Sequence, residues 1–292
     1  MRFSGVWLPI ITPFKDGEID HAGYERLVDH YVRAGIAGVI PLGTTGESPT
    51  IDEAETEALV ERTVATVAGR VPILIGVGGN DTRKVVKAVK RLQKHAVQGV
   101  FSVCPYYNRP GQDGLVAHLR ALASETDREV LIYNIPYRTA VNLSNESLLE
   151  LAEVPNIVGV KDSCGVLAQS LDLLARKPAG FSVLTGEDAL YFTMLANGAD
   201  GGILAASHIM TERFREVGRR FAGNDVAGAR AAWAPLAPTV PLLFAEANPM
   251  PIKYLLWRQG LIASPECRLP LTRISDGLAR RLDGLLPERL AA

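Results

Sequence analysis

Short apolar runs alternate with longer amphipathic segments along the first two thirds of the chain. The runs begin at residues 5, 38, 72, 99, 129, 156, 181 and 201. Their apolar residues are continuous rather than alternating with polar ones, which is typical of strands that are buried on both faces. Eight strand–helix units in about 205 residues predict a (β/α)8 TIM barrel. A doubly wound open sheet is the alternative, although such a sheet more often has about five to seven strands.

The segments between the runs carry helix-boundary signals. One of them is expected to begin at Thr50, with Glu53 three residues later as the second member of a capping box, and to end at Gly69. After Ser207 the strand pattern stops, and the remaining segments have helical spacing. We therefore predict a catalytic barrel at residues 1–207 and an all-helical C-terminal region at residues 208–292 that packs on it.

Composition narrows the class of protein. The 292 residues are 47% hydrophobic and 22% charged, with a formal net charge of -1. This charge gives no electrostatic footprint for nucleic acid or an anionic membrane. No apolar run approaches the roughly 20 residues that span a bilayer, and the N-terminus lacks a signal-peptide pattern. The three cysteines and five histidines are scattered, so we expect a cytoplasmic protein without a disulfide framework or a metal site.

Polar and aromatic residues gather where the predicted strands end. In a (β/α)8 barrel the carboxyl ends of the strands build the active site, whereas the starts of these runs carry no comparable residues. The strand-end segments are GTTGES (43–48), PYYNRP (105–110), YNIPYRT (133–139), GVKDS (159–163) and TGED (185–188).

Lys161 is the first candidate for chemistry because it ends an apolar strand. An ammonium group held among apolar neighbours loses hydration and its pKa falls, and the neutral amine can form a Schiff base with a carbonyl compound. The alternative is a structural lysine that pairs with Asp162 or Glu187. Tyr133 ends the preceding strand and should lie beside Lys161, where a phenol can transfer protons; a plain core tyrosine is the alternative.

Two further segments could bind anions. The loop at residues 43–47 offers two hydroxyls and several N–H groups beside a helix N-terminus, which suits a carboxylate. A simple strand-to-helix turn is the alternative. Arg138 follows Pro136 in a tight segment, where a guanidinium could clamp a second carboxylate; an ordinary surface arginine is the alternative.

These motifs, together with NPMPIKYLLWRQGLI and RLPLT near the C-terminus, resemble the dihydrodipicolinate synthase family. That family lies within the class I aldolases related to N-acetylneuraminate lyase. The resemblance covers nearly the whole chain in the right order. It implies a (β/α)8 barrel with a C-terminal helical region, assembled as a homotetramer of tight dimers, with no metal or organic cofactor.

The resemblance also implies catalytic roles. Lys161 would form an imine with pyruvate, and Tyr133 would act as the acid and base beside it. Tyr133 would be linked through the Thr45 hydroxyl to Tyr107, which in the family reaches across the dimer interface. Thr44 and Thr45 would hold the pyruvate carboxylate.

Further residues would bind the second substrate. Arg138 would bind the carboxylate of L-aspartate 4-semialdehyde, and Gly186 and the Ile203 carbonyl would line the site. The implied reaction yields 4-hydroxy-tetrahydrodipicolinate, in lysine and diaminopimelate biosynthesis. The alternatives are an aldolase or dehydratase acting on a 2-keto-3-deoxy sugar acid, and a barrel that binds a keto acid without turnover.

Some positions depart from the family pattern. Tyr137 stands where a small residue is usual, Ala140 where glycine is common and Cys104 where threonine is usual. These departures bear on the identity of the acceptor aldehyde more than on the pyruvate chemistry. Lys84 replaces the acidic residue expected to pair with an L-lysine inhibitor, so feedback by L-lysine is predicted to be weak or absent.

Overall fold

The computed structural model describes residues 3–286, and the chain divides into two compact units. One contains Pro72–Ile203 and the start of the chain up to Gly5, and the other contains Val6–Val71 and the described residues from Leu204 onward. The domain division expected at residue 207 stays a prediction.

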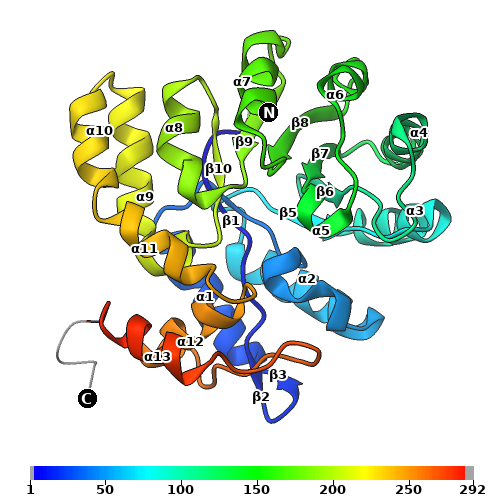
Figure 1. The fold of residues 1–292 in the computed structure, drawn as a ribbon. Helices are drawn as coiled ribbons and strands as arrows, with labels where there is room; N and C mark the ends of the chain where they lie inside the picture. The colour runs from blue at the N-terminus through cyan, green and yellow to red at the C-terminus, as the bar shows by residue number, and fades with distance from the viewer. Residues whose placement is uncertain (1–2, 287–292) are drawn as a thin grey trace. The chain divides into compact units, whose positions relative to one another are not determined.

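The first unit is built from parallel strands that alternate with helices. Its strands pair in the order β10-β9-β8-β7-β6-β5; β7 and β8 are labelled beside each other in Figure 1. The strands are β5 (Leu74–Val77), β6 (Gly99–Val103), β7 (Glu129–Asn134), β8 (Ile157–Asp162), β9 (Ser182–Thr185) and β10 (Gly201–Ile203). The helices are α3 (Thr82–Leu92), α4 (Gln112–Ala123), α5 (Pro136–Thr139), α6 (Asn145–Leu151), α7 (Leu167–Arg176), the 3-10 helix η3 (Asp188–Leu190) and α8 (Tyr191–Ala196).

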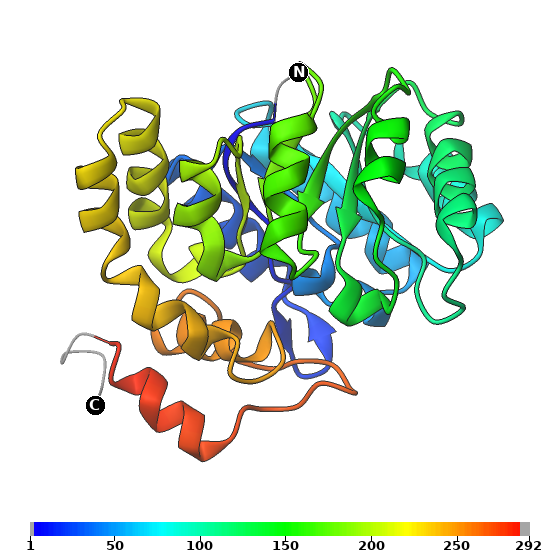
Figure 2. The ribbon, with the colours of Figure 1, turned by 45° about the horizontal axis from the view of Figure 1, so that its top comes forward.

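The second unit combines the remaining strands with the C-terminal helices. Strand β1 (Gly5–Leu8) pairs in parallel with β4 (Gly38–Val39), and β2 (Phe14–Lys15) forms a hairpin with β3 (Glu18–Ile19). Its N-terminal helices are α1 (His21–Arg33), the 3-10 helices η1 (Thr44–Gly46) and η2 (Ser48–Thr50), and α2 (Glu53–Val67). Its C-terminal helices are α9 (Ser207–Ala222), α10 (Val226–Trp233), α11 (Leu236–Leu243), α12 (Met250–Arg258) and α13 (Asp276–Asp283). Helices α9 and α10 lie side by side in Figures 1 and 2.

The predicted fold class is confirmed. The parallel strands follow the order β4-β1-β10-β9-β8-β7-β6-β5, with helices between them and further helices after β10. All eight apolar runs contain a strand of this sheet. The strand interiors are mostly buried, which explains why the runs are continuously apolar.

Two local features differ from the sequence expectations. The β2–β3 hairpin was not predicted, although its turn residues Asp16 and Gly17 have positive φ angles of 55° and 84°, the Asp-Gly signature of a tight hairpin. Helix α2 begins at Glu53 rather than Thr50. Its capping box is formed by Asp52, which accepts from the Glu55 N–H at 2.8 Å, and Glu55, which accepts from the Asp52 N–H at 3.0 Å. The prediction of the cap was wrong because Thr50 ends the preceding 3-10 helix η2.

A close approach between strands gives a stability prediction. A methyl group added to Gly159 in β8 would lie 2.3 Å from the backbone oxygen of Ser182 in β9. Because a backbone atom cannot move aside cheaply, we expect Gly159→Ala to lower the free energy of unfolding by about 2 kcal/mol or more. Urea unfolding measures this loss. Gly277→Ala is the control, since its nearest neighbour would lie at 3.9 Å and alanine favours the helix; equal losses in the two variants would contradict the steric argument.

Candidate active site

Lys161 lies near the end of β8 within an aromatic environment. Lys161 is 7% exposed, and in the sheet it pairs with Tyr133 of β7. The Lys161 Nζ lies 4.3 Å from the centroid of the Tyr133 ring and 5.9 Å from that of Phe101. The two rings are stacked, with their centroids 4.9 Å apart. The predicted neighbourhood of Lys161 and Tyr133 is therefore present.

Gly186 makes room for the lysine side chain. A methyl group added to this glycine would lie 2.3 Å from Lys161 Cε and 2.1 Å from Ser163 Oγ. The Gly186 N–H donates to the Asp162 carbonyl at 2.7 Å, which continues the pairing of β9 with β8. A residue with a side chain would collide with Lys161 in this position, so Gly186 lies against the lysine. Its place in a substrate site stays a prediction.

The neighbouring carboxylates do not form an ion pair with Lys161 among the described residues. Asp162 accepts hydrogen bonds from the Cys164 N–H at 3.1 Å and from the Ser170 hydroxyl at 2.5 Å. Glu187 has a buried Oε1 without a hydrogen-bond partner in residues 3–286, and burial raises the pKa of its carboxyl. The described residues therefore do not show the alternative arrangement, in which Lys161 is a structural lysine paired with Asp162 or Glu187.

Burial dominates the electrostatics of Lys161. Loss of hydration lowers its pKa from the ordinary 10.5 to about 8, and the charge of Arg138 adds to this effect. Asp188, Tyr137 and Glu187 oppose it. Close to pH 8 about half of the amine is therefore neutral. This is the state in which a lysine attacks a carbonyl carbon.

Arg138 lies on the short helix α5. Its guanidinium carbon lies 5.4 Å from the centroid of the Tyr137 ring, and Tyr137 is 67% exposed. The helix ends at Ala140, which has a left-handed φ of 59°. A glycine adopts this conformation without strain, which gives a physical reason for the glycine that the resemblance leads one to expect at this position.

The other predicted residues lie in different surroundings. Ile203 is fully buried at the end of β10, whereas Tyr107 is 87% exposed and has a left-handed φ of 71°. Thr44 and Thr45 belong to the second unit, in the 3-10 helix η1. Thr45 is 3% exposed, and its hydroxyl accepts a hydrogen bond from the Asn248 side chain at 2.9 Å.

Two features near Lys161 were missed by the sequence analysis. Phe101 was treated only as part of an apolar run, although alternation along β6 places it on the same face as Val103, the residue paired with Tyr133. The alternation of side chains along this strand was the signal in the sequence that could have identified Phe101. The orientation of Asp162 away from the lysine had no such signal, because it depends on Ser170 in α7.

Residues 2–288 match the model of the dihydrodipicolinate synthetase family. The chain belongs to this family. A 4-hydroxy-tetrahydrodipicolinate synthase of Clostridium acetobutylicum is 46% identical over 286 residues, which cover 98% of this chain and 100% of the relative. The crystal structure of dihydrodipicolinate synthase from Thermotoga maritima aligns with a TM-score of 0.96 at 36% identity, covering 100% of both chains. A dihydrodipicolinate synthase variant described as the first monomeric one aligns with a TM-score of 0.95 at 36% identity, covering 99% of this chain and 97% of its own.

Membership confirms the resemblance stated from the sequence motifs. The match runs through both units, including the C-terminal helices. In the part of the chain that the structure describes, no group of three or more His, Cys, Asp or Glu side chains is placed to share a metal ion.

The lowered pKa of Lys161 predicts its labelling behaviour. A small amine reagent such as acetic anhydride reacts only with the neutral amine. We therefore expect the labelling rate of Lys161 to reach half its maximum near pH 8, well below the pKa of about 10.4 that a lysine has in a short reference peptide. Peptide mass spectrometry after competitive labelling at graded pH, with such a peptide as an internal standard, measures both profiles. A Lys161 profile that overlies that of the reference peptide would contradict the burial argument.

Proposed function

We propose that this chain is a lyase of the class I aldolase type that condenses pyruvate with L-aspartate 4-semialdehyde. The product would be 4-hydroxy-tetrahydrodipicolinate, a precursor in lysine and diaminopimelate biosynthesis. The observation that carries the proposal is a buried amine with a pKa of about 8, in contact with the ring of a strand-end tyrosine and free of an ion pair among the described residues. The relatives named as 4-hydroxy-tetrahydrodipicolinate synthases support the choice of substrates.

The chemistry follows from the state of Lys161. Its neutral amine attacks the carbonyl carbon of pyruvate, and loss of water gives an imine. Loss of a methyl proton then turns the methyl carbon into an enamine nucleophile, which attacks the aldehyde carbon of the second substrate. Tyr133, stacked on Phe101 and beside the lysine, supplies the proton to the alkoxide that forms.

Substrate carboxylates require cationic or hydrogen-bonding groups. We assign the pyruvate carboxylate to Thr44 and Thr45 and the carboxylate of the aldehyde to Arg138, an exposed guanidinium in the same unit as Lys161. Ile203 would contribute its carbonyl to the site. These assignments rest on the family motifs.

We also propose that the chain self-associates, as a dimer or a homotetramer. Tyr107 and Tyr106 are 87% and 40% exposed, and adjacent exposed aromatic side chains are typical of an interaction surface. In a dimer Tyr107 would enter the partner's site and join the Tyr133–Thr45 relay. No helix within residues 3–286 combines the length and the apolar character needed to cross a membrane, and a cytoplasmic location stays a prediction.

Trapping with borohydride tests the proposed function directly. Incubation with pyruvate and sodium borohydride should add a reduced adduct to Lys161, located by peptide mass spectrometry. Lys161→Arg should abolish the adduct, because a guanidinium does not form an imine. Turnover of pyruvate with L-aspartate 4-semialdehyde should then exceed turnover with any of a panel of 2-keto-3-deoxy sugar acids. Absence of the adduct would refute imine chemistry, and preference for a sugar acid would refute the acceptor.

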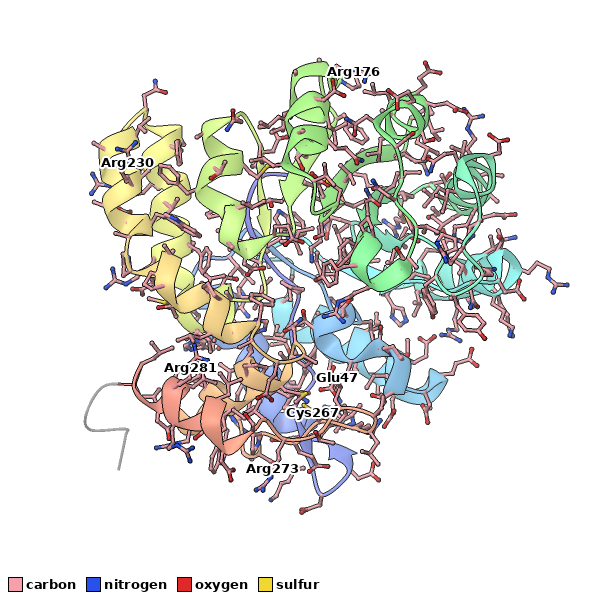
Figure 3. The ribbon with its side chains drawn as sticks, viewed as in Figure 1. Glu47, Arg176, Arg230, Cys267, Arg273 and Arg281 are labelled. Atoms are coloured by element: carbon pink, nitrogen blue, oxygen red, sulfur yellow. The ribbon has the colours of Figure 1, made fainter. Side chains whose placement is uncertain are left out.

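Removing the guanidinium of Arg138 should separate the two half-reactions. We expect Arg138→Ala to form the pyruvate adduct at Lys161 normally but to lose about 100-fold in kcat/KM for the semialdehyde, because a bidentate contact to a carboxylate is lost. Arg176→Ala is the control, since Arg176 (labelled in Figure 3) pairs with Glu146 and Asp172. Equal loss of adduct and turnover in Arg138→Ala would show that the residue has another role.

The charge of Lys84 predicts weak feedback by L-lysine. Lys84 is exposed on α3, a helix without an acidic residue, so the ammonium of a bound lysine would meet a like charge. We expect millimolar L-lysine to leave the steady-state rate unchanged, and Lys84→Glu to make the rate sensitive to it. A clear inhibition curve of the unaltered protein below millimolar L-lysine would contradict this expectation.

A further inference from the structure

The loop at residues 43–47 has a backbone that needs support. Thr44–Gly46 form the 3-10 helix η1, and Glu47 follows with a left-handed φ of 55°. A residue with a side chain rarely adopts this conformation, and it persists only where the surroundings hold it. The Thr12 hydroxyl donates to the Gly46 carbonyl at 2.8 Å, which anchors the middle of the loop.

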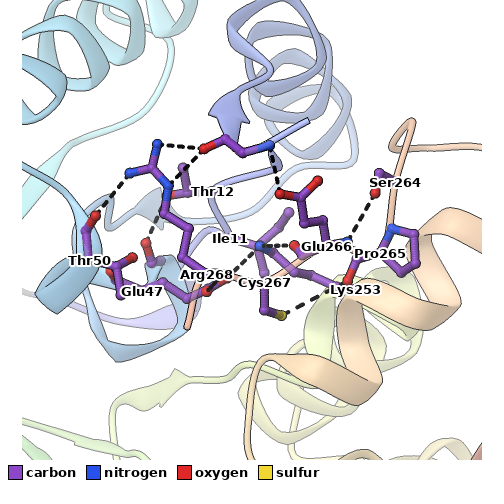
Figure 4. A network of polar contacts seen from close by, with 12 residues as sticks. Ile11, Thr12, Glu47, Thr50, Lys253, Ser264, Pro265, Glu266, Cys267 and Arg268 are labelled. Carbon is purple, nitrogen blue, oxygen red and sulfur yellow. Dashed lines mark hydrogen bonds and ion pairs between the residues drawn. The ribbon is translucent and has the colours of Figure 1, made fainter. Parts of the chain in front are cut away.

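Glu47 is held by a buried ion pair with Lys253 of α12. The side chains of Glu47 and Lys253 are 1% and 0% exposed, and the Lys253 ammonium donates to Glu47 Oε1. The same ammonium donates to the Glu266 carbonyl at 2.8 Å and lies 4.2 Å from the centroid of the Phe14 ring. Figure 4 shows this network.

The second oxygen of Glu47 is also occupied. Its Oε2 accepts from the Arg268 N–H at 3.0 Å. The Arg268 guanidinium continues to the Thr50 carbonyl at 2.9 Å and to Glu55. Figure 3 labels Glu47 close to Cys267, the residue before Arg268. Both carboxylate oxygens are therefore bound by the C-terminal part of the chain.

Asn248, just before α12, contacts Thr45 itself. Its amide nitrogen donates to the Thr45 hydroxyl oxygen at 2.9 Å. A hydroxyl has one hydrogen to donate, and that of Thr45 makes no hydrogen bond within residues 3–286. Because Asn248 occupies the oxygen as an acceptor, the hydroxyl hydrogen of Thr45 remains available for another acceptor, such as a carboxylate.

We propose that Asn248 and Lys253 are positioning residues for pyruvate binding: through Thr45 and Glu47, they hold the 43–47 loop in its substrate-binding conformation. This inference rests on the proposed function and on the assignment of Thr44 and Thr45 to the pyruvate carboxylate. The contacts fall on Thr45 and on the residue two positions later, so they fix the loop at the hydroxyls that would bind the ligand.

Stability alone does not account for a buried ion pair at this place. Well-packed apolar side chains of similar volume often stabilise a fold as well as a buried ion pair does, whereas removal of one partner leaves an unpaired charge. What apolar side chains cannot supply is the directed contact to both Glu47 oxygens, which holds the left-handed residue next to η1. The pair therefore serves the geometry of the loop.

The first test replaces Asn248 by leucine, which has the same branched side-chain shape without polar atoms. The Asn248 Oδ1 is buried without a partner among the described residues, so losing the amide is not expected to lower the melting temperature. Losing the hydrogen bond to Thr45 should raise the KM for pyruvate about tenfold with kcat within about threefold. A KM equal to that of the unaltered protein would overturn the role of Asn248.

The second test uses Lys253→Met, Glu47→Gln and the double variant. Lys253→Met leaves the Glu47 carboxylate buried and unpaired, so both stability and pyruvate binding should fall. The double variant removes both charges and should recover the melting temperature, yet keep a pyruvate KM raised by about tenfold or more, because the anchor of the loop is still missing. Recovery of both melting temperature and KM would show a merely structural pair.

Arg258→Met is the matched control. Arg258 lies on the same helix α12, and it pairs with Asp283 and contacts Tyr254. Its loss should lower the melting temperature while the pyruvate KM stays unchanged. If the unaltered protein forms no borohydride adduct at Lys161, the proposed function fails. If the adduct forms and the Asn248 and double variants keep a normal KM, only the positioning role fails.

Discussion

One constraint governs the first unit: the Lys161 ammonium group is removed from water, and no carboxylate among the described residues forms an ion pair with it. The Lys161 side chain lies against Gly186, where a larger residue would collide with it. It also lies against aromatic rings at the end of its strand. The carboxylate next to it in sequence is turned to a backbone N–H and to a serine of α7. Burial among these groups removes water from the amine and lowers its pKa, although the charges of Asp188 and Glu187 oppose this effect.

The two buried lysines of residues 3–286, Lys161 and Lys253, make a useful contrast. Burial lowers the pKa of both. Lys253 meets a fully buried carboxylate, a carbonyl oxygen and an aromatic face, and these three contacts favour the charged ammonium and oppose the effect of burial. Lys161 meets the aromatic face without an ion pair to a carboxylate among the described residues. The same kind of side chain is thus held by an ion pair to a carboxylate in one unit and, among the described residues, lacks such a pair in the other.

Sequence patterns predicted the features that depend on neighbours along the chain or between consecutive strands. The strands were recognisable because burial on both faces makes them continuously apolar. The contact of Lys161 with Tyr133 followed from the adjacency of β7 and β8. The start of α2 was misplaced because Thr50–Glu53 and Asp52–Glu55 both fit a capping box. The pair of Lys253 with Glu47 gave no signal, because a lysine within an amphipathic helix is normally exposed and its partner lies 206 positions away.

That separation also sets an order of events during synthesis. A ribosome adds about 5–20 residues per second, so Glu47 waits on the order of 10 to 40 s for Lys253 to be made. The residues of strands β5 to β10, which include Lys161, are all synthesised before those of α12. The residues that contact the 43–47 loop from α12 and beyond are therefore synthesised late, and a chain that ends before α12 lacks the contact of Lys253 with Glu47.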